Sequence, residues 1–396
     1  MKRVGASRVL GGFAVAALLA LGGATTAQAG DTIKVGLIIT YSGPFADSGR
    51  EMDNAIKLYM KQHGDTVAGK KIEIIRKDTG GPAPDVAKRL AQELVVRDNV
   101  DFLAGFVVTP EALAVADVAT QAKKPTIIMN AATSIITTKS PYFVRVSFTL
   151  PQVTEPLAHW AAKNGVKQAY TMVTDYGPGL DAEKAFQKAF TGDGGEIVGS
   201  VRMPLQSPEF SAYAQKVKDL NPQAVFIFVP SNDQPAQLMK TFAERGLTTS
   251  SIKIIATGDV TDDAVLQQEG DAALGLITSH HYSYAHDSAL NKEFTAAYAK
   301  EYGEFRPDFQ AVGGYDGMAL IYEVSKRLNG VIDGDKAMEA IKGMKIDSPR
   351  GPIMIDPETR DVVQTIYIRK VEKKDGKILN VEFDKVENVK DPGKQP

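Results

Sequence analysis

The chain lacks cysteine altogether and has few histidines, five in 396 residues. Without cysteine, thiol nucleophiles, thiolate metal sites and thiol redox chemistry are excluded, and stability must come from buried cores instead of disulfides. The sequence also has no large excess of charge of either sign, because it contains 46 basic and 48 acidic residues. Nucleic acid and anionic membrane surfaces are therefore not expected as partners.

Long hydrophobic runs are missing beyond the first 29 residues. Three basic residues precede an almost wholly apolar or glycine run from Val9 to Leu21, and Ala27-Gln28-Ala29 follows. This order is typical of a secretory signal peptide, with an uncleaved N-terminal anchor as the alternative. No later segment approaches 18 apolar residues, the length of a membrane span. We predict a soluble periplasmic protein, cleaved after Ala29 and not lipid-anchored, because no cysteine is present there to carry a lipid.

Motifs of catalysis are missing as well. The sequence has no phosphate-binding G-x-x-x-x-G-K-[ST], no G-x-S-x-G and no H-E-x-x-H. Gly177-Pro178-Gly179 lacks the third glycine of a dinucleotide-binding loop. His280 and His281 are adjacent in a predicted strand, where neighbouring side chains face opposite ways, and His286 falls in a predicted loop. We expect no enzyme activity, metal or cofactor, and one of the adjacent histidines, His281 in our site prediction, to face a cleft.

Short apolar strands alternate with amphipathic helices through most of the chain. One series runs from the strand Ile33–Ile39 to the strand Phe143–Val146, and a second runs from the helix Val153–Lys163 to the strand Ile252–Ala256. Nearly continuous apolar strands between helices are typical of parallel sheets covered on both faces. Since the chain exceeds the usual size of a single core, we predict an α/β fold with two doubly wound lobes.

The pattern changes near the C-terminus. After a predicted strand at Leu274–Ser279 and three helical stretches, the segments Val362–Val371 and Ile378–Val386 alternate as antiparallel strands do. Asp375-Gly376 between them predicts a hairpin turn. Residues 391–396 are predicted to form a polar tail.

Ligands of open α/β sheets bind at the carboxyl ends of the strands. The residues that follow the predicted strands include small, hydroxyl, aromatic and acidic side chains: Phe45, Ser48, Phe106, Thr109, Ala131, Ala132, Thr133, Tyr176, Ser231 and Asp259. Free N–H groups where such loops enter helices suit a carboxylate or another anion. Taken singly, many of these residues are ordinary turn and cap residues. Together they predict a small-molecule cleft between two lobes.

Several local motifs also occur in a characteristic order: Ile33-Lys34-Val35-Gly36, Ser42-Gly43-Pro44, Asn130-Ala131-Ala132-Thr133, Asp175-Tyr176-Gly177-Pro178-Gly179 and Gly313-Gly314-Tyr315-Asp316. In this order, residues 32–370 resemble the periplasmic Leu/Ile/Val-binding proteins, the solute receptors of branched-chain amino-acid-type ABC importers. The resemblance implies a type I periplasmic binding protein, with two lobes that close on a solute by hinge motion and a membrane permease as partner. We expect a monomer.

The resemblance also implies where the lobes begin and end. Residues 30–147 and 281–346 form lobe 1, and residues 148–280 and 347–390 form lobe 2. Three hinge crossings join them, near Ser147–Leu150, Ser279–Tyr282 and Lys345–Gly351.

Roles in the site carry over from the family as well. The solute carboxylate is implied to bind Thr109 and the segment Ala131, Ala132 and Thr133, the aromatic residue over the solute is Tyr176, and the acid near the ammonium is Asp259. Two positions depart from the family. A second acid expected near residues 148–150 is absent, and a second tyrosine is replaced by Ser231. Phe106 and Phe148 add apolar surface instead.

These departures favour an aromatic acid such as a benzoate or hydroxybenzoate as the solute. A single acid leaves a buried ammonium poorly satisfied, whereas Asp259 can accept a phenolic O–H and aromatic side chains can stack on the ring. The stretch Ser348-Pro349-Arg350-Gly351-Pro352 resembles receptors for aromatic or short-chain organic acids. Branched-chain or other hydrophobic amino acids are the alternative solutes. An exported enzyme and an input protein of a two-component sensor are the less favoured function classes.

Overall fold

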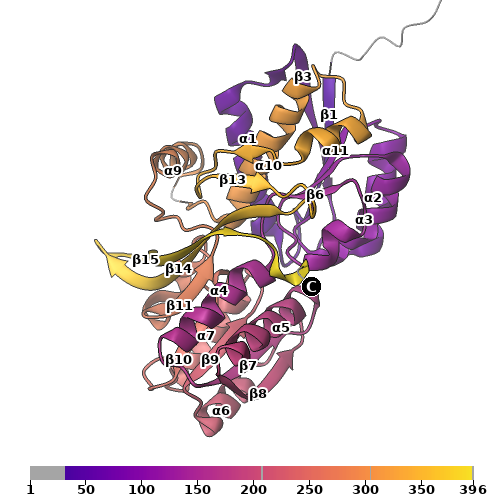
Figure 1. The fold of residues 1–396 in the computed structure, drawn as a ribbon. Coiled ribbons are helices and arrows are strands. Elements are labelled where there is room, and N and C mark those ends of the chain that lie inside the picture. Colours follow the sequence, from indigo (N-terminus) through magenta and orange to yellow (C-terminus); the bar gives the residue numbers. More distant parts are fainter. Residues whose placement is uncertain (1–31, 207, 304, 395–396) are drawn as a thin grey trace, which may run out of the picture. The chain divides into compact units, whose positions relative to one another are not determined.

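The computed structural model describes residues 32–206, 208–303 and 305–394 (Figure 1). The predicted signal peptide, residues 1–29, lies outside the described residues. Within the described ranges, no helix combines the length and the apolar character needed to cross a membrane.

The first sheet has six strands in the order β2-β3-β1-β4-β5-β6. Its strands are β1 (Thr32–Ile39), β2 (Thr66–Val67), β3 (Lys70–Asp78), β4 (Phe102–Gly105), β5 (Thr126–Ile128) and β6 (Phe143–Arg145). All neighbours pair in parallel except β2 with β3. Its helices are α1 (Ala46–His63), α2 (Pro84–Val96), α3 (Thr109–Ala122), α9 (Ala289–Tyr302), α10 (Phe309–Arg327) and α11 (Gly334–Ile341). We call these elements the first lobe.

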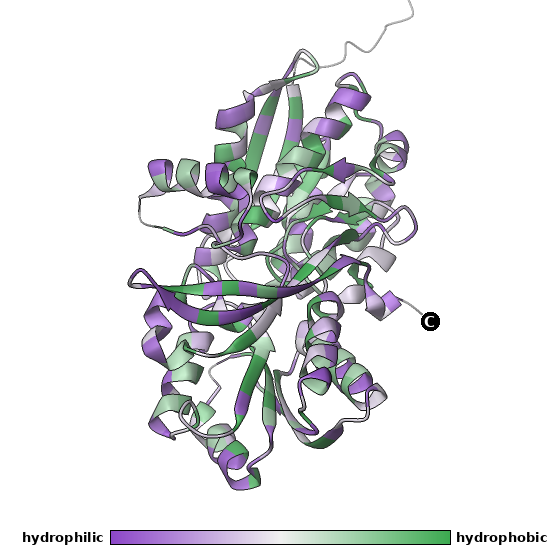
Figure 2. Cartoon of the chain, turned by 60° about the vertical axis from the view of Figure 1, so that its left-hand side comes forward, coloured by the Kyte–Doolittle hydropathy of each residue, from purple (hydrophilic) through white to green (hydrophobic). Residues whose placement is uncertain are grey.

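Strand β1 shows why this sheet is covered on both faces. Val35 and Leu37 belong to one hydrophobic cluster with residues of α1 and α10, whereas Ile38 belongs to another with residues of α2 and α3. Successive side chains of a strand point to opposite faces, so an apolar run needs helices on both sides. Figure 2 shows hydrophobic residues concentrated in the strands of both sheets.

The second sheet has the order β12-β13-β14-β11-β10-β9-β7-β8, and β15 pairs with β14. Its strands are β7 (Gln168–Thr174), β8 (Glu196–Met203), β9 (Ala224–Phe228), β10 (Lys253–Thr257), β11 (Ile277–His280), β12 (Lys345–Ile346), β13 (Ile353–Ile355), β14 (Val362–Lys374) and β15 (Lys377–Val389). Strands β7 to β11 pair in parallel, and the pairs that involve β12 to β15 are antiparallel. With α4 (Leu150–Lys163), α5 (Gly177–Gly192), α6 (Phe210–Leu220), α7 (Gln234–Glu244) and α8 (Leu266–Glu269) they form the second lobe.

The predicted α/β class with two doubly wound lobes is confirmed. The hairpin turn is confirmed too, because Asp375 and Gly376 have φ angles of 49° and 74°, as a type I′ turn requires. Four short helices were not predicted: η1 (Ser134–Thr138), η2 (Gly258–Thr261), η3 (Gly270–Ala273) and η4 (Pro392–Lys394).

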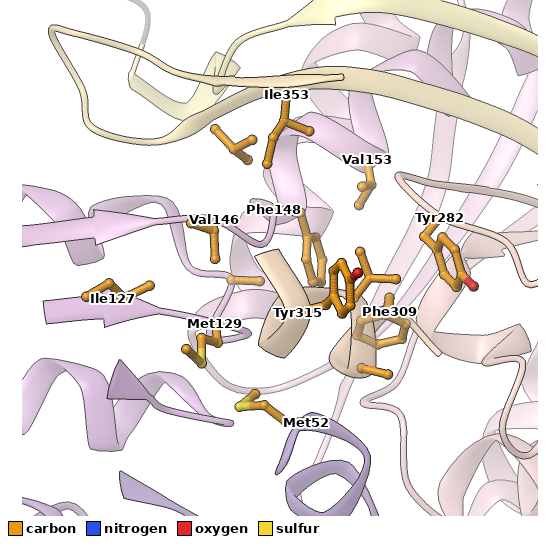
Figure 3. Packing of buried hydrophobic residues seen from close by; sticks show 14 of the residues in the cluster. Met52, Ile127, Met129, Val146, Phe148, Val153, Tyr282, Phe309, Tyr315 and Ile353 are labelled. Carbon is orange, nitrogen blue, oxygen red and sulfur yellow. The ribbon is translucent and has the colours of Figure 1, made fainter. Parts of the chain in front are cut away.

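The chain passes between the two sheets near the predicted crossings. It leaves the first sheet after β6 and enters α4, and it returns after β11 to α9. The third passage is not a short connecting segment. It contains strands, because β12 pairs with β13 and β13 pairs with β14. One hydrophobic cluster runs through this region, and Figure 3 shows Phe148, which follows β6, close to Phe309 at the start of α10. The exact lobe boundaries stay a prediction.

The predicted polar tail is packed against the body of the protein as far as Lys394. Asp391 is 3% exposed and accepts hydrogen bonds from the hydroxyls of Ser134 and Thr149. The Lys394 ammonium pairs with Asp361. The polar side chains of this segment therefore form hydrogen bonds and an ion pair with buried residues, in addition to any contact with solvent.

Candidate functional site

A cavity lies between the two lobes, at the carboxyl ends of their parallel strands. Nine of the twelve predicted site residues line it: Phe45, Ser48, Thr109, Ala131, Ala132, Phe148, Tyr176, Ser231 and Asp259. The sequence did not single out four further apolar or polar lining residues, namely Leu150, Phe228, Phe309 and Gln310. A cavity lined mostly by apolar and aromatic side chains with a few polar groups suits a small molecule.

One end of the cavity is rich in hydrogen-bond donors. Thr109 is the first residue of α3, where the helix dipole and free N–H groups favour an anion. Its Oγ1 lies 2.7 Å from Oγ1 of Thr133, in the loop after β5. The N–H of Ala131 donates to the Phe106 carbonyl at 3.0 Å and is not free, whereas the N–H groups of Ala132 and Thr133 have no acceptor within the described part of the chain.

The other end of the cavity carries Asp259, in η2 directly after β10. Asp259 is 6% exposed, and its Oδ2 has no hydrogen-bond partner among the described residues. Aromatic rings line the same cavity: Phe148 lies edge-on to Phe309 with centroids 5.6 Å apart, and Tyr176 stacks on Phe228 with centroids 6.1 Å apart. Burial, and then the Asp259 charge, raise the pKa of Tyr176, so this phenol stays protonated.

The two lobes are in contact around the cavity. The Ser48 hydroxyl of the first lobe lies 3.4 Å from the Ser231 carbonyl of the second. The N–H of Ser134 donates to Asp181 of α5 at 2.7 Å. At Gly177, the first residue of α5, a Cβ would lie 2.8 Å from the Thr133 Oγ1. The structure therefore describes a closed arrangement of the lobes.

Three predicted residues do not line this cavity. Phe106 has a φ of 67°, and its side chain is buried in the core between the first sheet and helices α2 and α3. Thr133 is hydrogen-bonded to Thr109 and faces Gly177 of the second lobe. His281 lies behind Phe148, with the ring centroids 4.8 Å apart and nearly parallel planes. Thr133 and His281 therefore contact residues that line the cavity, Thr109 and Phe148.

The expected opposite orientation of the two adjacent histidines is wrong. The ring centroids of His280 and His281 are 4.4 Å apart, because β11 ends at His280 and strand alternation does not extend to His281. His286 pairs instead with Glu382, at 2.9 Å. Among the residues that the structure describes, no group of three or more potential ligands is placed to hold a metal ion.

The family of the chain follows from its sequence together with this architecture. Residues 32–377 match the family model described as periplasmic binding protein. The chain belongs to this family.

Individual relatives of this periplasmic binding protein are similar over nearly their whole length. It is 44% identical to Leu/Ile/Val-binding protein homolog 6 of Brucella suis over 382 residues, 96% of this chain and 98% of the relative. A solute-binding protein of an ABC transporter from Rhodopseudomonas palustris BisB5, solved with 3,4-dihydroxybenzoic acid, is 58% identical, with a TM-score of 0.90 over 92% of this chain and 100% of the other. Another from R. palustris, solved with 4-hydroxybenzoate, is 41% identical, with a TM-score of 0.89 over 92% and 99%.

One residue that shapes the donor-rich end of the site was not predicted from the sequence. Arg145 of β6 is fully buried and donates to the carbonyls of Ala131 and Thr133, both at 2.9 Å, and to Asp361 at 2.8 Å. It therefore fixes the loop whose N–H groups are available for an anion. Its position within the otherwise apolar run Phe143–Val146 could have indicated this role, since a charge buried in a strand needs a specific partner.

A buried acid behind the site predicts how stability changes with pH. Glu111 of α3 is fully buried, and burial raises its pKa from 4.5 to about 7. Between these values the folded chain holds a proton that the unfolded chain releases, so the free energy of unfolding rises as pH falls from 8 to 5. We expect Glu111→Gln to flatten this rise and to stabilise the protein at pH 8 by up to about 3 kcal/mol.

Urea denaturation at pH 5 to 8 measures this effect. The exposed Glu339 gives the matched control, and Glu339→Gln should keep the wild-type pH profile. A Glu111→Gln profile parallel to that of the wild type would contradict the prediction.

Proposed function

We propose that this periplasmic binding protein is the solute receptor of an ABC importer and that its solute is a small aromatic carboxylate, a hydroxybenzoate in the favoured case. Its relatives solved with dihydroxybenzoic acid and hydroxybenzoate support the proposal. The observation that carries it is the polarity of the cavity: an anion-binding end at Thr109, aromatic walls, and a carboxylate at Asp259.

This polarity gives the solute one orientation. The solute carboxylate lies at the start of α3, where hydroxyls and N–H groups donate to it. The reverse orientation would place it against the Asp259 carboxylate, and two like charges repel strongly in a buried site. The ring then lies between Phe148 and Tyr176, and a hydroxyl opposite the carboxylate reaches Asp259.

Hydrophobic amino acids are the second candidate class, because the Brucella relative is a homolog of Leu/Ile/Val-binding proteins. Of the described residues that line the cavity, Asp259 alone carries a formal charge. An α-ammonium would therefore have one counter-charge at the end of the cavity remote from Thr109. An aromatic acid needs no such counter-charge, and this difference favours it.

Transport follows from closure of the lobes. In the proposed cycle, the exported protein binds the solute between lobe 1 (residues 30–147 and 281–346) and lobe 2 (148–280 and 347–390), and the permease binds the closed form. Because the solute contacts both lobes, it binds the closed form more tightly and shifts the population towards it.

Thermal unfolding tests the proposal. The mature protein is unfolded and refolded to remove bound solute, and its midpoint is measured with benzoate, 4-hydroxybenzoate, 3,4-dihydroxybenzoate, leucine and valine. A ligand at about 100 times its dissociation constant adds about 2.7 kcal/mol of stability. We expect hydroxybenzoates to raise the midpoint most. A rise with leucine or valine alone would contradict the aromatic assignment, and no rise with any compound would contradict the class of solute.

A further inference from the structure

His280 is buried next to the candidate site without a hydrogen bond that explains it. Its side chain is fully buried, and both ring nitrogens lack a partner within the described ranges. Its Nε2 lies 3.7 Å from Oδ2 of Asp259, slightly beyond hydrogen-bond distance. Oδ2 of Asp259 is itself buried and unpaired. Unpaired buried polar groups are costly, so this donor and acceptor require an explanation.

Packing holds the imidazole where it is. Its centroid lies 4.8 Å from that of Phe148 and 4.5 Å from that of Phe309. It also packs against the ring of His281, with centroids 4.4 Å apart, and against Gly258, where a Cβ would lie 2.5 Å from Cγ of His280. Burial lowers the pKa of His280 to about 4, so at neutral pH the ring is uncharged and has one N–H to donate.

The neighbouring cation does not replace this donor. Arg369 is buried close to Gly258, and its guanidinium donates to the hydroxyls of Thr278 and Thr261 and to the Tyr282 carbonyl. Among the described residues, its guanidinium donates no hydrogen bond to Asp259. The imidazole is the uncharged donor that approaches the Asp259 carboxylate.

We propose that His280 is a positioning residue that makes Asp259 select solutes with a ring hydroxyl. The inference rests on the proposed function and names His280 as the residue that gives the site its specificity for a hydroxylated ring. A solute hydroxyl donates to one oxygen of Asp259, and the Nε2–H of His280 donates to the other, which it approaches to within hydrogen-bond distance in the bound state. The carboxylate then accepts on both sides and is fully satisfied.

A solute without this hydroxyl leaves the Asp259 carboxylate buried with one oxygen unpaired. A site built to hydrogen-bond a substrate hydroxyl rejects the analogue that lacks it more strongly than an apolar pocket does. With the imidazole removed, the carboxylate is free to turn away from the cavity, and the hydroxyl loses a fixed acceptor. The preference for a hydroxybenzoate over benzoate therefore depends on His280.

Isothermal titration calorimetry with 4-hydroxybenzoate and benzoate tests this inference. We expect the wild type to bind 4-hydroxybenzoate more tightly. His280→Leu should reduce the ratio of the two affinities about tenfold, the order of one hydrogen bond to a charged group, mainly by weakening 4-hydroxybenzoate. His280→Gln, which keeps an N–H donor, should retain part of the ratio.

The adjacent His281 provides a matched control. It is equally buried and stacks on the same Phe148, but the 3.7 Å approach to Asp259 is made by His280. His281→Leu should keep the wild-type ratio even if both affinities fall. An unchanged ratio in His280→Leu, or the same reduction in His281→Leu, would overturn the inference. Failure of the wild type to bind either acid would contradict the proposed function instead.

Discussion

Replacing Arg145 with methionine is expected to lower the free energy of unfolding by about 3 kcal/mol, because it removes one of the two counter-charges of the buried Asp361, leaving Lys394, and leaves buried carbonyls without their donor. Both side chains are at most 1% exposed, and the ion pair is 2.8 Å long. The same change frees the carbonyls of Ala131 and Thr133, so solute affinity should fall as well. Urea denaturation of the solute-free protein measures the first effect, and calorimetry with 4-hydroxybenzoate measures the second.

Two further variants distinguish the contribution of the buried ion pair from the effect of losing one positive charge. Arg89 is 66% exposed and lies 3.8 Å from its partner Glu93, so Arg89→Met should cost less than about 1 kcal/mol. Adding Asp361→Asn to Arg145→Met should cost less than the two single changes together, because both changes break the same ion pair. Equal destabilisation by Arg145→Met and Arg89→Met would show that the buried pair is not important for folding.

Replacing Gly177 with alanine is expected to weaken solute binding roughly 10- to 100-fold, since overpacking costs about 1–3 kcal/mol and each 1.4 kcal/mol is tenfold in affinity. The new methyl group would lie 2.8 Å from Oγ1 and 3.3 Å from Cγ2 of Thr133, across the cleft. Rotation of Thr133 would break its hydrogen bond to Thr109. The clash exists only when the lobes are closed, so the stability of the solute-free open form should be little affected.

Gly192, the last residue of the same helix, offers the control. A Cβ there meets nothing within 4 Å, and Gly192→Ala should bind 4-hydroxybenzoate as the wild type does. Calorimetry gives the affinities, and small-angle scattering gives the degree of closure at saturating solute. Wild-type affinity in Gly177→Ala would mean that the bound lobes do not approach each other at this point.

The sequence predicts local features best. The alternation of apolar residues locates nearly all the longer strands and helices, and Asp375-Gly376 locates a turn because few other pairs adopt two consecutive positive φ angles. The strand-end rule finds Thr109 and Asp259, since parallel strands bring their following loops to one edge. These predictions depend on neighbours in the chain or on the direction of strands.

Features that depend on distant partners were not predicted. Arg145 and Asp361 are 216 residues apart in sequence, so neither one indicates the other. Phe106 was assigned to the cleft because it follows β4, but Gly105 and Phe106 have φ angles of 109° and 67° and turn its side chain into the core. The end of β11 at His280 similarly decides the orientation of His281. Single backbone angles of this kind leave little trace in the amino-acid pattern.

The packed segment from Asp391 to Lys394 matters for anyone who converts this receptor into a fluorescent biosensor. Its hydrogen bonds reach Ser134 of η1, before the first crossing, and Thr149, within that crossing. A fluorescent reporter fused directly after Lys394 would therefore disturb the hinge whose motion it is meant to measure. The exposed turn at Asp375-Gly376 is the better attachment point for a passive label.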